Sequence, residues 1–144
     1  MEAKVLAYLD AHKEELFNLL SEMLKIDTQN YTTYGLEEAG QNFFADYCHE
    51  HGFETDWYCP DDVPGLVDHP GYLEGRNTDK RPNVTAILPG KTGKHKITLA
   101  AHMDTMPIGR EEDWTVPALG GVIKNNKIFG RGSSDDKYGI AASN

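Results

Sequence analysis

The chain has 144 residues, enough for one domain with a hydrophobic core and too few for two. Acidic residues outnumber basic ones by 23 to 14, giving a formal net charge of −9, and no basic run could follow a phosphate backbone. We therefore expect no nucleic-acid partner. No apolar run approaches the ~20 residues of a membrane span, and the N-terminus has no signal-peptide core, so we expect a soluble cytoplasmic protein that does not bind membranes.

The first sixty residues predict two helices followed by a strand. Over residues 3–26, apolar side chains recur at steps of three and four, which indicates an amphipathic helix with a break near Asp10. A second helix is predicted over residues 36–51, and Gly52 stands where a helix ends in the left-handed conformation. Residues 53–58 alternate apolar and polar side chains, the pattern of a strand with one solvated face.

The remaining elements complete an α/β fold with a mixed twisted sheet flanked by helices. Residues 59–81 are rich in Pro, Gly and Asp and predict an ordered loop. Residues 83–88 and 96–101 are two apolar runs with a turn-rich connection, so we expect them to form strands that pair antiparallel. Residues 121–129 predict a short hairpin around a polar turn. No repeat or linker divides the chain.

A histidine and a carboxylate lie at the end of the second apolar run. His102 and Asp104 are two positions apart, and Pro107 prevents the strand from continuing. Because side chains alternate along a strand, both should point to the same side, where the carboxylate can accept a proton from one imidazole nitrogen. The other ring nitrogen is then free and fixed in direction for a metal ion.

A second polar cluster occupies residues 130–139, where a loop rich in Gly and Ser carries Asp135 and Asp136 into a predicted helix. Serines and aspartates are also the usual residues at a helix N-terminus, so a purely structural capping role stays open. A glycine loop that binds phosphate is a further alternative. The adjacent carboxylates and the missing Gly-Lys-Ser/Thr ending argue against it.

Taken together, the motifs His-x-Asp-Thr and Gly-Arg-Gly-x-x-Asp-x-Lys, separated by a Trp and Pro segment, resemble a known metallopeptidase family. This family contains aminoacylase, carboxypeptidase G, acetylornithine deacetylase and succinyl-diaminopimelate desuccinylase. The resemblance covers residues 83–144 well and the earlier residues loosely. It implies the amino-terminal portion of a zinc-exopeptidase-like catalytic domain. Asp136 and Tyr138 depart from the residues that are common in the family, but neither change removes a ligand.

The resemblance also implies roles for individual residues. His102 would ligate one metal ion and Asp135 would bridge two, while Asp104, the catalytic residue of this set, would hold the His102 ring and raise its basicity. Imidazole and carboxylate ligands suit two zinc ions, or cobalt or manganese in their place. The peptide bond between Asp135 and Asp136 is predicted to be cis.

The activity that the resemblance implies is hydrolysis of amide bonds in N-acyl amino acids or small peptides, most like that of acetylornithine deacetylase, in a full-length homodimer. The family's general base and its other ligands are expected after Asn144, as is the lid or dimerisation domain. Residues 1–144 are therefore expected to be a partial, metal-binding catalytic domain that is inactive when made alone. The alternative is a non-catalytic acidic α/β module that carries a relic metal site.

Overall fold

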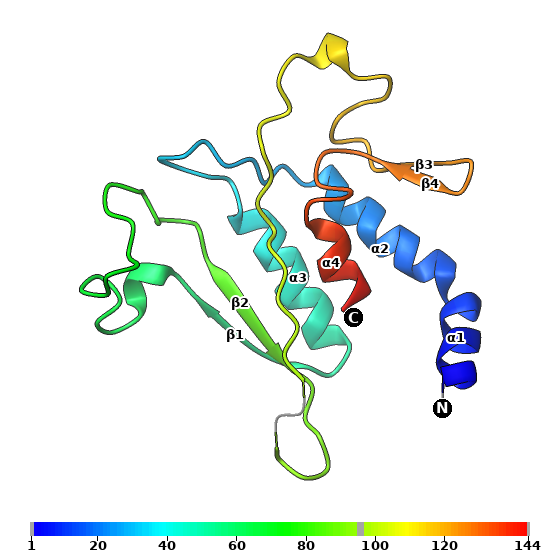
Figure 1. The fold of residues 1–144 in the computed structure, drawn as a ribbon, viewed down its shortest axis with the longest axis horizontal. Coiled ribbons are helices and arrows are strands. Elements are labelled where there is room, and N and C mark those ends of the chain that lie inside the picture. The colour runs from blue at the N-terminus through cyan, green and yellow to red at the C-terminus, as the bar shows by residue number, and fades with distance from the viewer. Residues whose placement is uncertain (1, 95–96, 144) are drawn as a thin grey trace.

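The computed structural model of the protein describes residues 2–94 and 97–143. Three helices come first, two pairs of strands follow, and a short helix ends the described chain, with two short 3-10 turns in the connections (Figure 1). None of the helices in these ranges is both long and apolar enough to cross a membrane. The elements are α1 (Glu2–Ala11), α2 (Lys13–Lys25), α3 (Glu38–Glu50), β1 (Glu54–Tyr58), η1 (Pro60–Asp62), β2 (Asn83–Ile87), η2 (Glu111–Asp113), β3 (Val122–Lys124), β4 (Lys127–Phe129) and α4 (Lys137–Ala142).

The predicted break in the first helix is confirmed, because α1 and α2 are separate helices with His12 between them. The two differ in how they use their apolar side chains. Helix α1 buries none of its residues, and Val5, Leu6 and Leu9 are each more than half exposed. Helix α2 turns its apolar face inward and supplies most of the core. Packing therefore stabilises α2 far more than α1.

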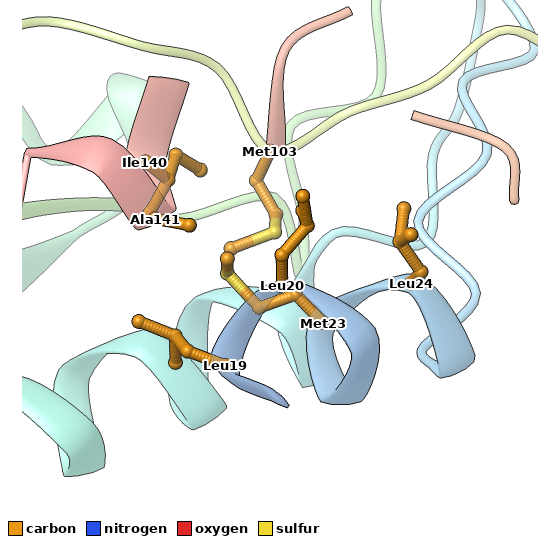
Figure 2. Close-up of a cluster of buried hydrophobic side chains, with 7 residues drawn as sticks. All are labelled: Leu19, Leu20, Met23, Leu24, Met103, Ile140 and Ala141. Carbon is orange, nitrogen blue, oxygen red and sulfur yellow. The ribbon is translucent and has the colours of Figure 1, made fainter. Parts of the chain in front are cut away.

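The hydrophobic core forms where α2, α4 and the segment before Thr105 meet (Figure 2). Met103 is 2% exposed and its side chain reaches toward Met23 of α2, which is fully buried. Burying a side chain of this size is worth roughly 1.5–3 kcal/mol. Because side chains alternate along an extended segment, this anchor directs the neighbours of Met103 outward. The buried cluster comprises Leu19, Leu20, Met23, Leu24, Met103, Ile140 and Ala141.

Helix α3 packs against an antiparallel pair formed by β1 and β2 (Figure 1). The predicted helix over 36–51 is confirmed with slightly shorter bounds, and Gly52 has the left-handed φ of 83° expected at its end. Trp57 of β1 lies opposite Val84 of β2, and its indole Nε1 donates a hydrogen bond to Asn42 of α3. This bond links the helix to the sheet.

The expected pairing of residues 83–88 with residues 96–101 is wrong. Strand β2 pairs with β1, and residues 97–101 are extended but belong to no strand, while Lys96 lies outside the described residues. Ile97 and Leu99 are 78% and 59% exposed. An apolar run forms a strand only where a neighbour supplies hydrogen bonds along its edge, and the sequence pattern does not reveal that neighbour.

The predicted hairpin is confirmed, with β3 and β4 paired antiparallel. Its turn residues Asn125 and Asn126 have φ values of 53° and 58°, as a type I′ turn requires. Asparagine tolerates this left-handed conformation better than most residues. Helices combined with two small antiparallel sheets confirm the predicted α/β class.

Gly40 of α3 is buried where the helix crosses the core, and we expect Gly40→Ala to destabilise the protein. A Cβ atom there would lie 2.6 Å from Cγ2 of Thr28 and 2.8 Å from Cγ of Met103. Alanine gains about 1 kcal/mol in helix propensity, but overpacking costs roughly 1–3 kcal/mol. Urea denaturation should show a net loss of about 1 kcal/mol in the free energy of unfolding.

The control is Ala39→Gly, because Ala39 is exposed on the same helix and reports propensity without packing. If Gly40→Ala raised the free energy of unfolding by as much as Ala39→Gly lowered it, the tight contact at Gly40 would be refuted.

Candidate metal centre

The segment that carries His102 is held in place by the residues that follow α2. The Thr105 amide donates to the Thr28 carbonyl at 3.0 Å, and the Asn30 amide donates to the Thr105 carbonyl at 2.8 Å. The Thr28 hydroxyl, which is fully buried, donates to the Met103 carbonyl at 2.8 Å. These bonds form a short parallel bridge between Gln29 and Thr105. The backbone on both sides of the predicted site residues is therefore fixed.

His102 lies between two carboxylates, as the sequence predicts. Its Nδ1 atom is 3.1 Å from Oδ1 of Asp104 and 3.0 Å from the Asp104 carbonyl oxygen. Its Nε2 atom is 3.0 Å from Oδ1 of Asp135, 33 residues farther along the chain. The predicted meeting of His102 and Asp135 is confirmed. It occurs at the end of the unpaired segment 97–101 and not at the edge of a described sheet, so that part of the prediction fails.

Asn30, which no sequence motif indicates, also belongs to this cluster. Its side-chain amide donates to Oδ2 of Asp104 at 3.0 Å, on the carboxylate oxygen that does not face the imidazole. The Asp104 carboxylate is therefore held from both ends. No pattern in the sequence joins a residue after the first helices to one 74 positions later, so only the folded chain reveals this contact.

The loop that carries Asp135 approaches the His102 segment closely because of Gly132. This glycine has a φ of 91°, and a Cβ there would lie 2.7 Å from Cγ2 of Thr105. A larger residue would therefore need both an unfavourable backbone conformation and a shift of Thr105. The peptide bond between Asp135 and Asp136 is cis, as predicted.

Lys137 fixes the other end of this loop. Its side chain is fully buried, and Nζ donates to the carbonyl oxygens of Met23 and Ile26 at 2.9 Å each. Burial lowers the pKa of Lys137 to about 8, and the carboxylate of Asp27 opposes that shift. The C-terminal end of α2 is where a cation is favoured by the helix dipole. The sequence motif that contains Lys137 does not by itself indicate this role.

The electrostatics of the cluster favour a positive charge at His102. Partial burial lowers the pKa of His102, but the Asp104 carbonyl and the carboxylates of Asp104 and Asp135 together raise it above its ordinary value. The His102 side chain is 50% exposed and that of Asp135 is 81% exposed. A cation that replaced the proton between Nε2 of His102 and Asp135 would contact the Asp135 carboxylate, and it could reach this position from solvent.

The donor atoms fit part of a metal site. His102 Nε2 and Asp135 Oδ1 point at each other, and a nitrogen and a carboxylate oxygen are ligands that zinc accepts. Asp135 makes this contact instead of capping α4, whose N-cap residue is Asp136 without a side-chain capping bond. Within residues 2–94 and 97–143, no group of three or more His, Cys, Asp or Glu side chains is arranged to hold a metal ion. Further ligands would have to come from elsewhere.

Three relatives show how much of the chain is shared with known proteins. A succinyl-diaminopimelate desuccinylase of Bradyrhizobium sp. is 48% identical over 86 residues, which is 56% of this chain and 22% of the relative. The N-formyl-4-amino-5-aminomethyl-2-methylpyrimidine deformylases of Halalkalibacterium halodurans and Bacillus subtilis are 27% and 29% identical. Those alignments cover 96% and 92% of this chain, and 29% and 28% of the relatives. The chain thus spans about a quarter of their length.

The position of His102 between two carboxylates predicts a measurable titration. In metal-free protein, the pKa of His102 should lie above the ordinary value of about 6.5, and Asp104→Asn or Asp135→Asn should each lower it. The attraction to the carboxylates stabilises the fold at low pH and is lost as pH rises through that raised pKa. An NMR titration of the ring proton on Cε1 measures the shift.

Asp46→Asn is the control for that titration, because Asp46 is exposed on α3 and makes no contact with His102. A His102 pKa that all three substitutions left unchanged would contradict the arrangement.

The part of the chain that contains both motifs also matches a protein-family profile. Residues 98–143, which include His102, Asp104 and Asp135, match the sequence profile described as Peptidase family M20/M25/M40. This range contains both predicted motifs and the hairpin between them. Over these residues the chain is similar to the peptidase family M20/M25/M40, and the family resemblance predicted from its two motifs is confirmed.

Proposed function

We propose that residues 1–144 form the metal-binding part of a catalytic domain that hydrolyses amide bonds of N-acyl amino acids or small peptides. The observation that carries this proposal is the contact between His102 Nε2 and Asp135 Oδ1, with Asp104 behind the other ring nitrogen. Two relatives bear names that denote removal of a succinyl or a formyl group, and this supports an acylated amine as substrate.

In this proposal each residue has a distinct task. Asp104 orients the His102 ring and keeps its Nε2 atom available as a ligand, and Asn30 keeps the Asp104 carboxylate in place. Asp135 contributes a carboxylate that is largely exposed and therefore has room to contact a second ion. A pair of divalent ions bound here supplies a nucleophilic water at neutral pH and polarises the carbonyl of the scissile amide.

The described residues do not complete such a site. Catalytic zinc ions typically have three protein ligands, whereas His102 and Asp135 are two residues that would serve two ions. A general base is also needed, and Asp104, the carboxylate beside His102, already orients the imidazole. We therefore propose that other ligands and the base lie outside residues 1–144 and that this chain alone does not turn over substrate.

Several finer points rest on the family resemblance alone and belong to the same proposal. They are zinc in preference to cobalt or manganese, a substrate like acetylornithine, and a homodimeric full-length protein; a cytoplasmic location is proposed from the sequence pattern instead. The competing proposal is a non-catalytic module with a relic metal site. Measuring amide cleavage by the full-length protein distinguishes the two.

The experiment uses a full-length protein that contains these residues. We expect removal of metal with a chelator to abolish cleavage of N-acetyl, N-succinyl and N-formyl amino acids, and zinc, cobalt or manganese to restore it. His102→Ala should lose at least about 100-fold in kcat/KM, because one ion loses its imidazole ligand. His49→Ala is the matched control, since His49 is exposed in the last turn of α3. Activity that survived metal removal, or equal activity of the two variants, would contradict the proposal.

A substitution at Asp104 tests whether this residue supports metal binding by orienting the His102 ring. Asp104→Asn should weaken metal affinity by roughly 10–100-fold, because a carboxamide holds the imidazole less strongly than a carboxylate. The circular dichroism spectrum should stay the same, since Asp104 is outside the hydrophobic core. Competition with a chelating dye measures the affinity, with Asp46→Asn as control. If Asp104→Asn bound metal as tightly as the control, Asp104 would have no orienting role.

A further inference from the structure

Residues 106–114 directly follow the His-x-Asp-Thr motif and form one wall beside the candidate metal centre. The two ends of this segment, Met106 and Trp114, line a cavity of about 390 Å³ that also borders Asp135. Apart from the short turn η2, the segment contains no helix or strand. Regular secondary structure therefore does not hold this wall in place, and other contacts must do so.

A single hydrogen bond ties this segment to the residues that follow α2. The Ile108 amide donates to Oε1 of Gln29 at 2.7 Å, and Gln29 is only 5% exposed. Of the hydrogen bonds found among the described residues, no other joins residues 106–114 to a different part of the chain. The Ile108 carbonyl in turn accepts a hydrogen bond from the indole Nε1 of Trp114 at 2.8 Å. Gln29 thus fixes Ile108 directly and Trp114 through it.

Asp27 determines which way the Gln29 amide points. Nε2 of Gln29 donates to both carboxylate oxygens of Asp27, at 3.0 and 3.1 Å. An ionised carboxylate accepts hydrogen bonds and cannot donate them, so the amide nitrogen faces Asp27 and the amide oxygen is left for Ile108. Hydrogen bonds to a charged acceptor are also stronger than those between neutral groups. The Gln29 side chain is therefore oriented before it receives the Ile108 amide.

The residues from Asp27 to Asn30 divide their side-chain contacts between two parts of the site. Thr28 and Asn30 hold the segment that carries His102, through the hydrogen bonds described above. Asp27 and Gln29 hold the segment that comes after it. This division follows from the alternation of side chains along an extended chain. Loss of the Gln29 side chain should therefore leave the predicted metal ligands in place.

We propose that Gln29 is a positioning residue for the candidate metal centre, which holds residues 106–114 beside Asp135 without supporting metal binding. This inference rests on the proposed function and adds to it a residue that acts on the substrate and not on the metal. Without Gln29, the contact of His102 with Asp135 persists, but a bound substrate meets a wall that moves. The expected signature is a higher KM at unchanged metal affinity, whereas Asp104→Asn is expected to weaken metal binding.

The first test separates substrate binding from metal binding in the full-length protein. Gln29→Ala should raise KM for the acylated amino acid that the protein cleaves fastest by roughly 3–10-fold, the range expected for loss of one hydrogen bond. Its metal affinity, measured with a chelating dye, should not change. Gln41→Ala is the matched control, because the Gln41 side chain on α3 makes no hydrogen bond among the described residues. An unchanged KM, or a metal affinity lowered as in Asp104→Asn, would overturn the proposal.

A swap of two side chains tests the contact itself. Gln29→Glu keeps an acceptor for the Ile108 amide but places a second carboxylate against Asp27, so KM should rise as in Gln29→Ala. Adding Asp27→Asn restores a donor opposite the new carboxylate at the original net charge, and the double variant should recover most of the unaltered KM. If the double variant were no better than Gln29→Glu, the contact would not position the segment and the proposal would be wrong. This comparison stands even if Gln29→Ala does not fold.

A third measurement requires no catalysis. Metal-free, full-length protein is labelled with 5-fluorotryptophan, and the fluorine NMR resonance of Trp114 is identified by its absence from Trp114→Phe. Gln29→Ala should shift this resonance, because the indole loses the fixed position of its Ile108 acceptor, and Gln41→Ala should not. A Trp114 resonance that stayed the same in Gln29→Ala would refute the positioning role.

These outcomes are distinct from failure of the proposed function. If the metal-loaded protein cleaved no acylated amino acid but the Trp114 resonance shifted in Gln29→Ala and returned in the double variant, the hydrolase proposal would fail and Gln29 would still position the segment. Cleavage with the same KM in the unaltered protein and in Gln29→Ala would give the reverse result.

Discussion

The C-terminal end of α2 is the point to which both halves of the candidate metal centre are attached. On one side, Lys137 places its buried ammonium group on the carbonyls of Met23 and Ile26. On the other side, the residues after α2 form the bridge that holds Thr105. The first contact fixes the loop of Asp135 and the second fixes the segment of His102. The distance between these two side chains is therefore determined by one helix end.

The cost of burying a lysine shows how much this attachment contributes. A charged ammonium group loses its water shell on burial, which is why the pKa of Lys137 falls to about 8. Two carbonyl oxygens and the negative end of the α2 dipole offset that loss. An apolar residue could fill the same space, but it would not make the two hydrogen bonds that join the loop to the end of α2.

Sequence periodicity predicted those parts of the fold that depend on short-range contacts. Helices α2 and α3 and the β3–β4 hairpin are encoded by neighbours a few residues apart, and so is the orientation of His102 toward Asp104. Asp135 was predicted from a motif and lies where the motif implies. Residues 97–101 were predicted as a paired strand because their composition is apolar, but composition does not specify a partner. The contacts of Asn30 and Lys137 join distant parts of the chain, and no local pattern encodes them.

The extended segment 97–101 links sheet formation to the chemistry of the site. Its side chains are exposed, and it pairs with no strand among the described residues, yet it leads directly into His102. A strand that aligns along this segment would fix the last residues before the imidazole and restrict its motion. The rigidity of the metal centre is consequently governed from two directions, by α2 behind it and by whatever occupies the edge of residues 97–101. Pairing along residues 97–101 would therefore also preorganise the imidazole of His102.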